Sequence, residues 1–262
     1  MTINIFQSNI NQENLIQSFV EFGINKGDCL EVHSSLSSFG YIEGGAVSVV
    51  NALMAAVGAN GLLLMSAFYL SKALPLIAED HKNEINLKLN ILNDRSEERS
   101  GMGVIVDEFL TRDDVVTSTG VFRLAAWGRD AQDYIDNGFA EVVSTNTKTL
   151  LLGVNYDKCS SLHQSEDIAL PNPLKNHLTL PDSIRQQYSK ELYIGYRDTF
   201  EVHFINAGQQ AEQQGLVQKK QIGSAQCKLF YPKDIVEILR GWRKKSPYWL
   251  MGYDELKVMN HE

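Results

Sequence analysis

A histidine and two carboxylates lie in a short polar segment that follows an apolar run. His163 is followed by Glu166 and Asp167, and the apolar run Thr149–Val154 precedes them. Imidazole has an unperturbed pKa of about 6.5, so a nearby carboxylate can orient it as a proton acceptor near neutral pH. His163 is therefore the best general base that this chain offers. The alternative is structural: the carboxylates complement a helix dipole and His163 occupies a surface position.

A segment rich in serine and glycine has the composition of a phosphate cradle. Three serines offer hydroxyls and backbone amides at a strand end, and two glycines then allow close backbone approach before a helix, whose N-terminus favours anions. A pyrophosphate would fit there. The segment is neither a G-x-x-x-x-G-K-[ST] loop nor a G-x-G-x-x-G loop, and an ordinary turn is the alternative. The residues are Ser34, Ser35, Ser37, Gly44 and Gly45.

Three segments together resemble the aminoglycoside 3-N-acetyltransferase family in order and spacing. They are Leu30–Gly40 with Glu43–Gly45, then Leu124–Gly128, then Gly153–Glu166. The resemblance extends over most of the chain. It implies acyl transfer from a coenzyme A thioester to a primary amine of an amino sugar. The expected fold is α/β, with a central mixed, partly parallel sheet flanked by helices, as in that family.

The resemblance also implies roles for individual residues. Asp94 precedes Met102-Gly103 at the spacing of a family aspartate, so it is a candidate partner for the base or the amine, although Arg95 replaces the usual proline. The predicted catalytic residues are His163, Asp94 and Glu166. The predicted residues of the acyl-CoA site are His33, Ser34, Ser35, Leu36, Ser37, Phe39, Gly44 and Gly45.

Two departures from the family concern the acceptor. Many relatives have Pro-Thr-Phe after the second strand, where this chain has Ser66–Phe68, and a histidine pair where it has Thr119–Arg123. The predicted acceptor-binding residues are Phe68, Phe122 and Arg123, because a ring and a cation suit a nucleotide. The sequence therefore favours a nucleotide-linked amino sugar, with an aminoglycoside antibiotic as the alternative.

Two further functions stay open. Cys159 lies four residues before His163, a spacing at which side chains meet on a helix, so a Cys-His thioester hydrolase is conceivable. The second is a catalytically silent module that binds coenzyme A. No orienting residue for Cys159 is identifiable, and free cysteine is more often a small core residue.

The elements that must position these residues follow from hydrophobic periodicity. A strand at Cys29–Val32, a helix at Ala46–Val57 and a strand at Gly61–Met65 indicate parallel pairing. A polar segment at about 71–100 is expected to be partly helical. The other predicted elements are helices starting at Leu15, over Met102–Thr111, Ser161–Leu170 and Pro232–Lys244, a strand over Thr149–Val154, and one or two antiparallel strands over Leu192–Phe204.

Composition narrows the class of protein. The 262 residues are 44% hydrophobic, enough to bury a large core, and we expect a single domain over residues 1–262. A net charge of −8 argues against nucleic-acid binding. Three separated cysteines, no apolar run long enough for a membrane helix and no signal peptide predict a cytoplasmic protein. The histidines show no metal-ligand spacing, so no metal is expected, and a homo-oligomer is possible.

Overall fold

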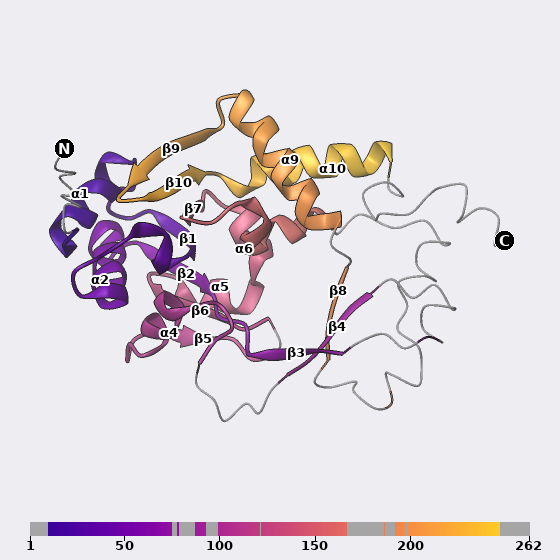
Figure 1. The fold of residues 1–262 in the computed structure, drawn as a ribbon, viewed down its shortest axis with the longest axis horizontal. Helices are drawn as coiled ribbons and strands as arrows, with labels where there is room; N and C mark the ends of the chain where they lie inside the picture. The colour runs from indigo at the N-terminus through magenta and orange to yellow at the C-terminus, as the bar shows by residue number, and fades with distance from the viewer. Residues whose placement is uncertain are drawn as a thin grey trace, which may run out of the picture.

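A seven-stranded mixed sheet forms the centre of the computed structural model, and a separate three-stranded sheet lies beside it (Figure 1). Among the residues that the structure describes, no helix is long and apolar enough to cross a membrane. The described residues are 10–74, 78, 87–92, 99–120, 122–166, 186, 192–196 and 199–246.

The central sheet is parallel in its middle and antiparallel at its edges. β2, β1 and β7 pair in parallel, and every other pairing is antiparallel. This confirms the predicted mixed, partly parallel sheet. The carboxyl ends of the parallel strands meet at one edge, where ligands bind in α/β folds. In order across the sheet the strands are β5 (Val116–Thr117), β6 (Leu124–Gly128), β2 (Leu62–Ser66), β1 (Cys29–Ser34), β7 (Lys148–Leu152), β10 (Ala225–Phe230) and β9 (Val217–Ile222).

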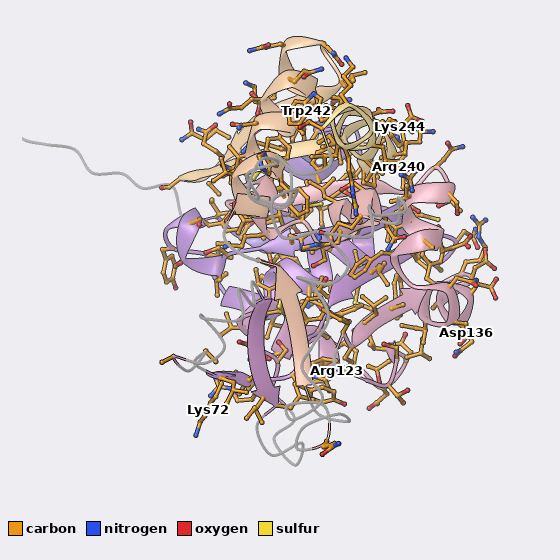
Figure 2. All side chains as sticks on the ribbon, turned by 90° about the vertical axis from the view of Figure 1, so that its right-hand side faces the viewer. Lys72, Arg123, Asp136, Arg240, Trp242 and Lys244 are labelled. Carbon is orange, nitrogen blue, oxygen red and sulfur yellow. The ribbon has the colours of Figure 1, made fainter. Side chains whose placement is uncertain are left out.

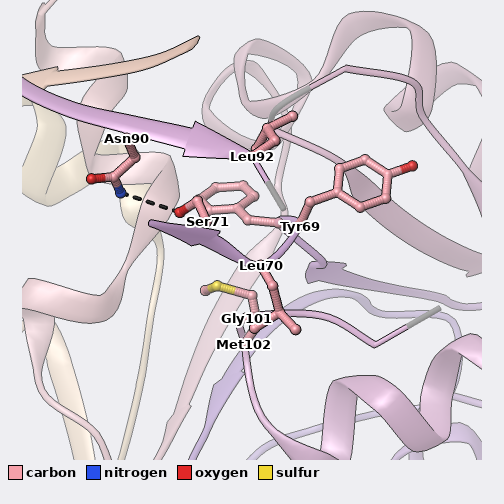
Figure 3. A pocket seen from close by; sticks show the side chains of 8 residues that line it. Tyr69, Leu70, Ser71, Asn90, Leu92, Gly101 and Met102 are labelled. Carbon is pink, nitrogen blue, oxygen red and sulfur yellow. Dashed lines mark hydrogen bonds between the residues drawn. The ribbon is translucent and has the colours of Figure 1, made fainter. Parts of the chain in front are cut away.

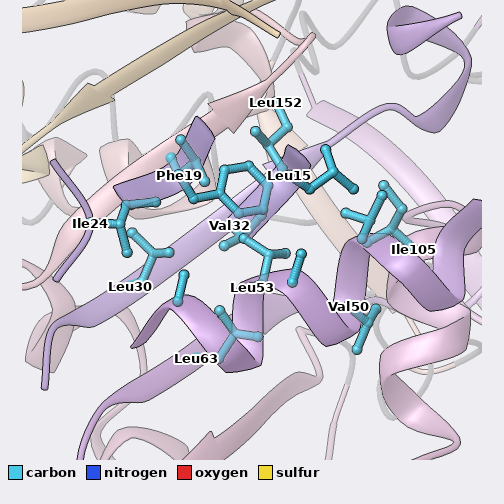
Figure 4. Close-up of a cluster of buried hydrophobic side chains, with 14 of the residues drawn as sticks. Leu15, Phe19, Ile24, Leu30, Val32, Val50, Leu53, Leu63, Ile105 and Leu152 are labelled. Carbon is cyan, nitrogen blue, oxygen red and sulfur yellow. The ribbon is translucent and has the colours of Figure 1, made fainter. Parts of the chain in front are cut away.

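Helices cover both faces of this sheet because its central strands are apolar on both sides. On β7, Leu150 and Leu152 belong to the core of the first face, and Leu151 belongs to the core of the second. Figure 4 shows Leu152 in the first of these cores. The first face carries α1 (Gln12–Glu21), α2 (Gly45–Val57) and α4 (Val104–Leu110). The second carries α5 (Ala131–Asn137), α6 (Phe139–Ser144), α9 (Thr199–Gln213) and α10 (Pro232–Lys245).

Strand β1 breaks the apolar pattern on one side only. Leu30 and Val32 belong to the core of the first face. Alternation along a strand therefore directs Glu31 and His33 toward the second face. That face also receives two 3-10 helices that follow β7, η2 (Tyr156–Lys158) and η3 (Ser160–Glu166). A third, η1 (Leu36–Phe39), follows β1 directly.

The second sheet was not predicted. It contains β3 (Ser71–Leu74), β4 (Leu87–Leu92) and β8 (Leu192–Tyr196), paired antiparallel. Two of these strands lie in the polar segment that was expected to be partly helical. The alternation of leucine or isoleucine with polar residues in β4 was the overlooked signal.

Most of the predicted elements are confirmed, and two need correction. The antiparallel strand expected from Leu192 is β8, but from Thr199 onward the chain is helical, so His203 lies on α9 and not on a strand. The helix predicted over Ser161–Leu170 is a 3-10 helix in its described part. The hairpin of β9 and β10 was missed, although Gly223-Ser224 between two strand-like runs is a hairpin signal.

Candidate functional site

His163 and Glu166 form a hydrogen-bonded pair on η3. Their Nδ1 and Oε1 atoms are 2.6 Å apart, and the edge of the imidazole contacts Phe204 of α9 at a centroid distance of 4.9 Å. An ionised carboxylate only accepts, so in the neutral imidazole beside it Nδ1 would carry the hydrogen and Nε2 the lone pair. The His163 side chain is 49% exposed and that of Glu166 only 15%. The imidazole is thus accessible and the carboxylate is largely shielded from solvent.

Helix η3 is attached on two sides. Ser66 Oγ, at the carboxyl end of β2, donates to Ser160 Oγ at 3.0 Å. From α10, Arg240 Nη2 donates to the Gln164 carbonyl and Arg243 Nη1 to the Ser165 carbonyl, each at 3.0 Å. A 3-10 helix has poor internal hydrogen bonds, so external contacts decide where it lies. These contacts hold it against the second face of the sheet.

A buried carboxylate connects β1, β7 and η3. Glu31 is fully buried, and its Oε1 lies 2.9 Å from His33 Nε2. Its Oε2 accepts from Thr149 Oγ1 at 2.6 Å and from Ser161 Oγ at 2.7 Å. Burial raises the pKa of Glu31, but the charge of His33 and these hydrogen bonds outweigh burial, so the pKa lies below its ordinary value. The carboxylate is therefore ionised at neutral pH.

Cys159 belongs to this buried cluster and not to His163. Its Sγ lies 3.4 Å from Ser161 Oγ. This sulfur, a carboxylate oxygen of Glu31 and a ring nitrogen of His33 lie within 4.8 Å of one another. The residue is 1% exposed, and burial followed by the charge of Glu31 raises the pKa of the thiol well above its usual range. A protonated, shielded thiol is a poor nucleophile and a poor metal ligand. The described contacts of His163 are with Glu166 and Phe204.

The predicted acyl-CoA segment forms a turn between β1 and α2. Ser34 Oγ is buried with no hydrogen-bond partner among the described residues, and the Ser35 and Ser37 hydroxyls are 3.1 Å apart. Leu36 and Phe39 pack into the core of the first face, so they anchor the turn. The free hydroxyl at the end of β1 is the part of this turn that fits a polar ligand.

Two glycines shape the start of α2. Gly44 and Gly45 have backbone φ of 75° and 55°, values that residues with a side chain rarely adopt. A Cβ at Gly44 would overlap the Ser48 hydroxyl, whereas a Cβ at Gly45 would meet nothing within 4 Å. The space beside Gly45, at the N-terminus of a 13-residue helix, is open to an anion.

The predicted acceptor residues lie together. Phe68 and Phe122 make an edge contact with ring centroids 5.3 Å apart. Arg123 Nε donates to the Ala67 carbonyl at 2.8 Å, and its guanidinium lies 4.1 Å from the Tyr69 ring centroid. Arg123 is 9% exposed, and its Nη2 is buried with no hydrogen-bond partner in the described part of the chain. Arg123 lies far from α10, where Arg240 and Trp242 are found (Figure 2).

A pocket of about 270 Å³ lies between the end of β2 and the small sheet (Figure 3). Asn90 and Ser71 supply its polar wall, joined by a hydrogen bond of 3.2 Å from Asn90 Nδ2. No carboxylate lines the pocket among the residues that the structure describes. Its lining is Phe68, Tyr69, Leu70, Ser71, Asn90, Leu92, Gly101 and Met102.

The structure thus brings together two of the predicted groups. His163 pairs with Glu166, and Phe68, Phe122 and Arg123 lie close together; Asp94 falls outside the described residues. Sequence reasoning missed Glu31. Its signal was a charged residue inside a segment predicted as a buried strand.

Comparison with known proteins identifies the family. The sequence profile of the aminoglycoside 3-N-acetyltransferase family matches residues 32–244. The chain belongs to this family, whose members are coenzyme A-dependent acyltransferases, and so the predicted family, fold and enzyme class are confirmed.

Two relatives match most of the chain. The aminoglycoside N(3')-acetyltransferase-like protein YokD of Bacillus subtilis (strain 168) is 25% identical over 88% of this chain and 91% of its own. Aminoglycoside N(3)-acetyltransferase IV of Salmonella sp is 26% identical, over 89% of this chain and 87% of its own.

Solved structures share the fold at lower identity. The apoenzyme of aminoglycoside acetyltransferase AAC(3)-IVa is 22% identical, with a TM-score of 0.70 over 98% of this chain and 99% of its own. A mutant of that enzyme has been solved in complex with a gentamicin. AAC-IIIb, solved with CoASH, is 18% identical, with a TM-score of 0.67 over 91% of this chain and 97% of its own.

Proposed function

We propose that this protein transfers an acetyl group from acetyl-CoA to a primary amine of an aminoglycoside, with His163 as the general base. The observation that carries the proposal is the hydrogen-bonded His163–Glu166 pair on η3. It supplies a proton acceptor in a protein whose family performs acetyl transfer. The aminoglycoside is chosen over a nucleotide-linked sugar because one named relative is an aminoglycoside acetyltransferase and the other is described as aminoglycoside acetyltransferase-like.

The pair provides what direct transfer to an amine requires. A primary amine is protonated near neutral pH and cannot attack a thioester until it loses a proton. His163 Nε2 accepts that proton while Glu166 holds Nδ1 and balances the imidazolium charge. The amine nitrogen bonds to the carbonyl carbon and loses its second proton to solvent, the carbon–sulfur bond breaks, and the imidazolium returns its proton to the departing sulfur.

The turn between β1 and α2 is the proposed site of the donor. The buried Ser34 hydroxyl has no hydrogen-bond partner in the described structure, so a polar ligand would satisfy it. The α2 N-terminus beside Gly45 offers backbone N–H groups to a pyrophosphate. The Ser34 hydroxyl lies at the end of β1. In the sheet β1 is two strands from β6 and next to β7, the strand that leads to η3.

A nucleotide-linked amino sugar is the second candidate acceptor, because of one observation. Arg123 is almost fully buried, yet its Nη2 lacks a hydrogen-bond partner among the described residues, and the nearby pocket has no carboxylate in its described lining. A guanidinium suits a phosphate, whereas a polycationic aminoglycoside needs carboxylates. Arg123 is therefore the residue on which the two acceptor classes differ.

The acceptor is tested by following thiol release from acetyl-CoA with the pure protein. The panel contains gentamicin, apramycin and nucleotide-linked amino sugars. Acetylation of the aminoglycosides is the expected result. Turnover with nucleotide-linked sugars alone, lost in Arg123→Met, would establish the second candidate instead.

The base is tested by replacing His163 with alanine. Turnover should fall by about 10² to 10⁴, the usual contribution of a general base, while coenzyme A affinity by calorimetry stays within a few fold. Unchanged turnover would exclude His163 as the base. Loss of coenzyme A binding would instead place His163 in the donor site.

The other two functions make different demands. A thioester hydrolase would need an ionised, accessible Cys159, and this thiol is buried with a raised pKa. A silent binding module would bind coenzyme A and release no thiol with any amine in the panel. The thiol-release assay therefore separates all of these functions.

A further inference from the structure

We propose that Glu31 is a positioning residue for acetyl transfer: through Ser161 it fixes the 3-10 helix that presents His163. The role rests on the proposed function, because it needs His163 to be the base. Glu31 lies on β1, the central strand of the seven, and is fully buried. A carboxylate there requires an explanation, since parallel central strands are usually apolar on both faces.

The two oxygens of this carboxylate serve different parts of the site. Oε1 faces His33, at the end of the strand that leads into the proposed donor turn. Oε2 faces η3 through Ser161, two residues before His163. One buried group therefore connects the donor side of the site to the helix that carries the base.

The contact between Ser161 and Glu31 attaches η3 to the central strand of the sheet. Arg240 and Arg243 hold the carbonyls at its C-terminal end, and Ser66 holds Ser160 at its start. The hydrogen bond from Ser161 to Glu31 joins this start to the middle of the sheet. Catalysis is sensitive to such anchoring, because a displacement of about 1 Å can cost 10²-fold in rate.

Stability alone would not favour this arrangement. Burying a charge is costly, and a well-packed apolar side chain is often at least as stabilising as a buried ion pair. Apolar residues such as Leu151, Leu162 and Phe204 form a large part of the core on the second face. A carboxylate in such a core is consistent with a need to fix one geometry.

The structure offers a matched pair of variants. Ser161 and Thr149 are both fully buried, and both donate a hydroxyl hydrogen bond to the same oxygen, at 2.7 and 2.6 Å. Ser161 lies on η3, whereas Thr149 lies on β7 and pairs directly with Glu31 in the sheet. Ser161→Ala and Thr149→Val each remove one bond to Glu31, but only Ser161→Ala releases η3.

Both kcat and the KM for acetyl-CoA are measured in the two variants. For Ser161→Ala we expect kcat to fall at least about tenfold, with the KM for acetyl-CoA within about threefold. Thr149→Val should lower kcat by less than about threefold, while the thermal midpoints of the two variants fall by similar amounts. Equal values of kcat in the two variants would overturn the proposal, because a structural role alone would affect both alike.

Glu31 itself is tested by a double-mutant cycle. Glu31→Leu should lower kcat about as much as Ser161→Ala, and the double variant should be no worse than either single variant. Glu31→Gln keeps an acceptor oxygen for Ser161, so it should retain more activity than Glu31→Leu. Additive losses would show that Glu31 does not act through Ser161. Should Glu31→Leu fail to fold, the comparison of Ser161→Ala with Thr149→Val still tests the positioning role of Glu31.

Amide hydrogen exchange over residues 155–166 gives a readout that does not depend on activity. Exchange should accelerate in Ser161→Ala and remain near wild type in Thr149→Val. If His163→Ala is inactive and exchange is equal in Ser161→Ala and Thr149→Val, the positioning role of Glu31 is overturned and the role of His163 as the base is kept. Retained turnover in His163→Ala would overturn the base, and the positioning role with it. Stoichiometric zinc that disappears in Cys159→Ala would instead make the cluster a metal site.

Discussion

His163 and Glu166 differ in exposure in the way a base and its orienting group should. The imidazole is about half exposed, so a substrate amine can reach it, whereas the carboxylate is largely shielded and its hydrogen bond is strengthened. Phe204 supports the ring from α9 and limits its rotation. The short spacing within η3 brings the pair together, and Phe204 from α9 packs against its ring.

Replacing Glu166 with glutamine tests the carboxylate. The amide oxygen can still accept from Nδ1, but the charge that stabilises the imidazolium is lost. We expect kcat to fall by roughly tenfold or more, though less than in His163→Ala, with little change in KM. Steady-state kinetics with a saturating acceptor measures this. A rise in KM with unchanged kcat would assign Glu166 to amine binding.

Replacing Cys159 with serine tests the thiol. Because the thiol is buried and its pKa is raised, we expect turnover to stay within about threefold of wild type. A thiol reagent should react first with Cys29, which is only partly buried. Loss of activity in a folded Cys159→Ser protein would favour an acyl-enzyme mechanism and contradict direct transfer.

At the scale of residues, the sequence predicts local chemistry and misses distant partners. His163 and Glu166 are three residues apart, so their pairing follows from helical spacing alone. The partners of Glu31 are 118 and 130 residues away in the chain. No spacing rule connects such residues, because the register of β1 on β7 and the path of η3 bring them together.

At the scale of elements, prediction failed where local preference and tertiary packing disagree. The segment from Thr199 contains Phe200, Val202 and Phe204, residues that favour strands. In the structure Phe204, Ala207 and Ala211 share one buried side of α9, a helical spacing of three and four residues. The small alanines, which suit close helix packing, were the better signal.

Gly208 shows how closely α9 packs. A Cβ at this position would overlap the Tyr156 ring on η2. We expect Gly208→Ala to lower the free energy of unfolding by about 1–3 kcal/mol despite the better helix propensity of alanine. Because α9 also carries Phe204, which contacts His163, kcat should fall as well. Urea unfolding and steady-state kinetics measure the two effects.

Gly241 on α10 provides the matched control. A Cβ there would meet nothing within 4 Å, so Gly241→Ala should stabilise the protein by about 0.5–1 kcal/mol and leave kcat unchanged. Similar changes in the two variants would show that the approach of α9 to Tyr156 is not under packing constraint.

At the scale of the whole molecule, the parallel centre of the sheet was predictable and its surroundings were not. A strand, a helix and a second strand in succession imply parallel pairing of β1 and β2. The small sheet joins β3 and β4 to β8, which is about 100 residues further along the chain. Such non-local pairing leaves little trace in periodicity.

The buried carboxylate makes the stability of the whole molecule depend on pH. Because the pKa of Glu31 is lower in the folded protein than its ordinary value of 4.5, the ionised group contributes stability above that pH. This contribution is lost as the pH falls through the folded-state pKa. Glu31→Gln lacks the titrating group, so the difference in unfolding free energy between wild type and this variant should shrink on acidification from pH 6 to pH 3.

The exposed carboxylate of Glu43 gives the comparison for this measurement. Glu43→Gln removes one carboxylate from the surface, and its urea unfolding is followed over the same pH range as the control. His33 and Cys159 are the titratable groups that face Glu31, so the measured difference includes their coupling to it. A difference that grows on acidification would mean that Glu31 is protonated in the folded protein, and Ser161 would then be held by a neutral carboxyl.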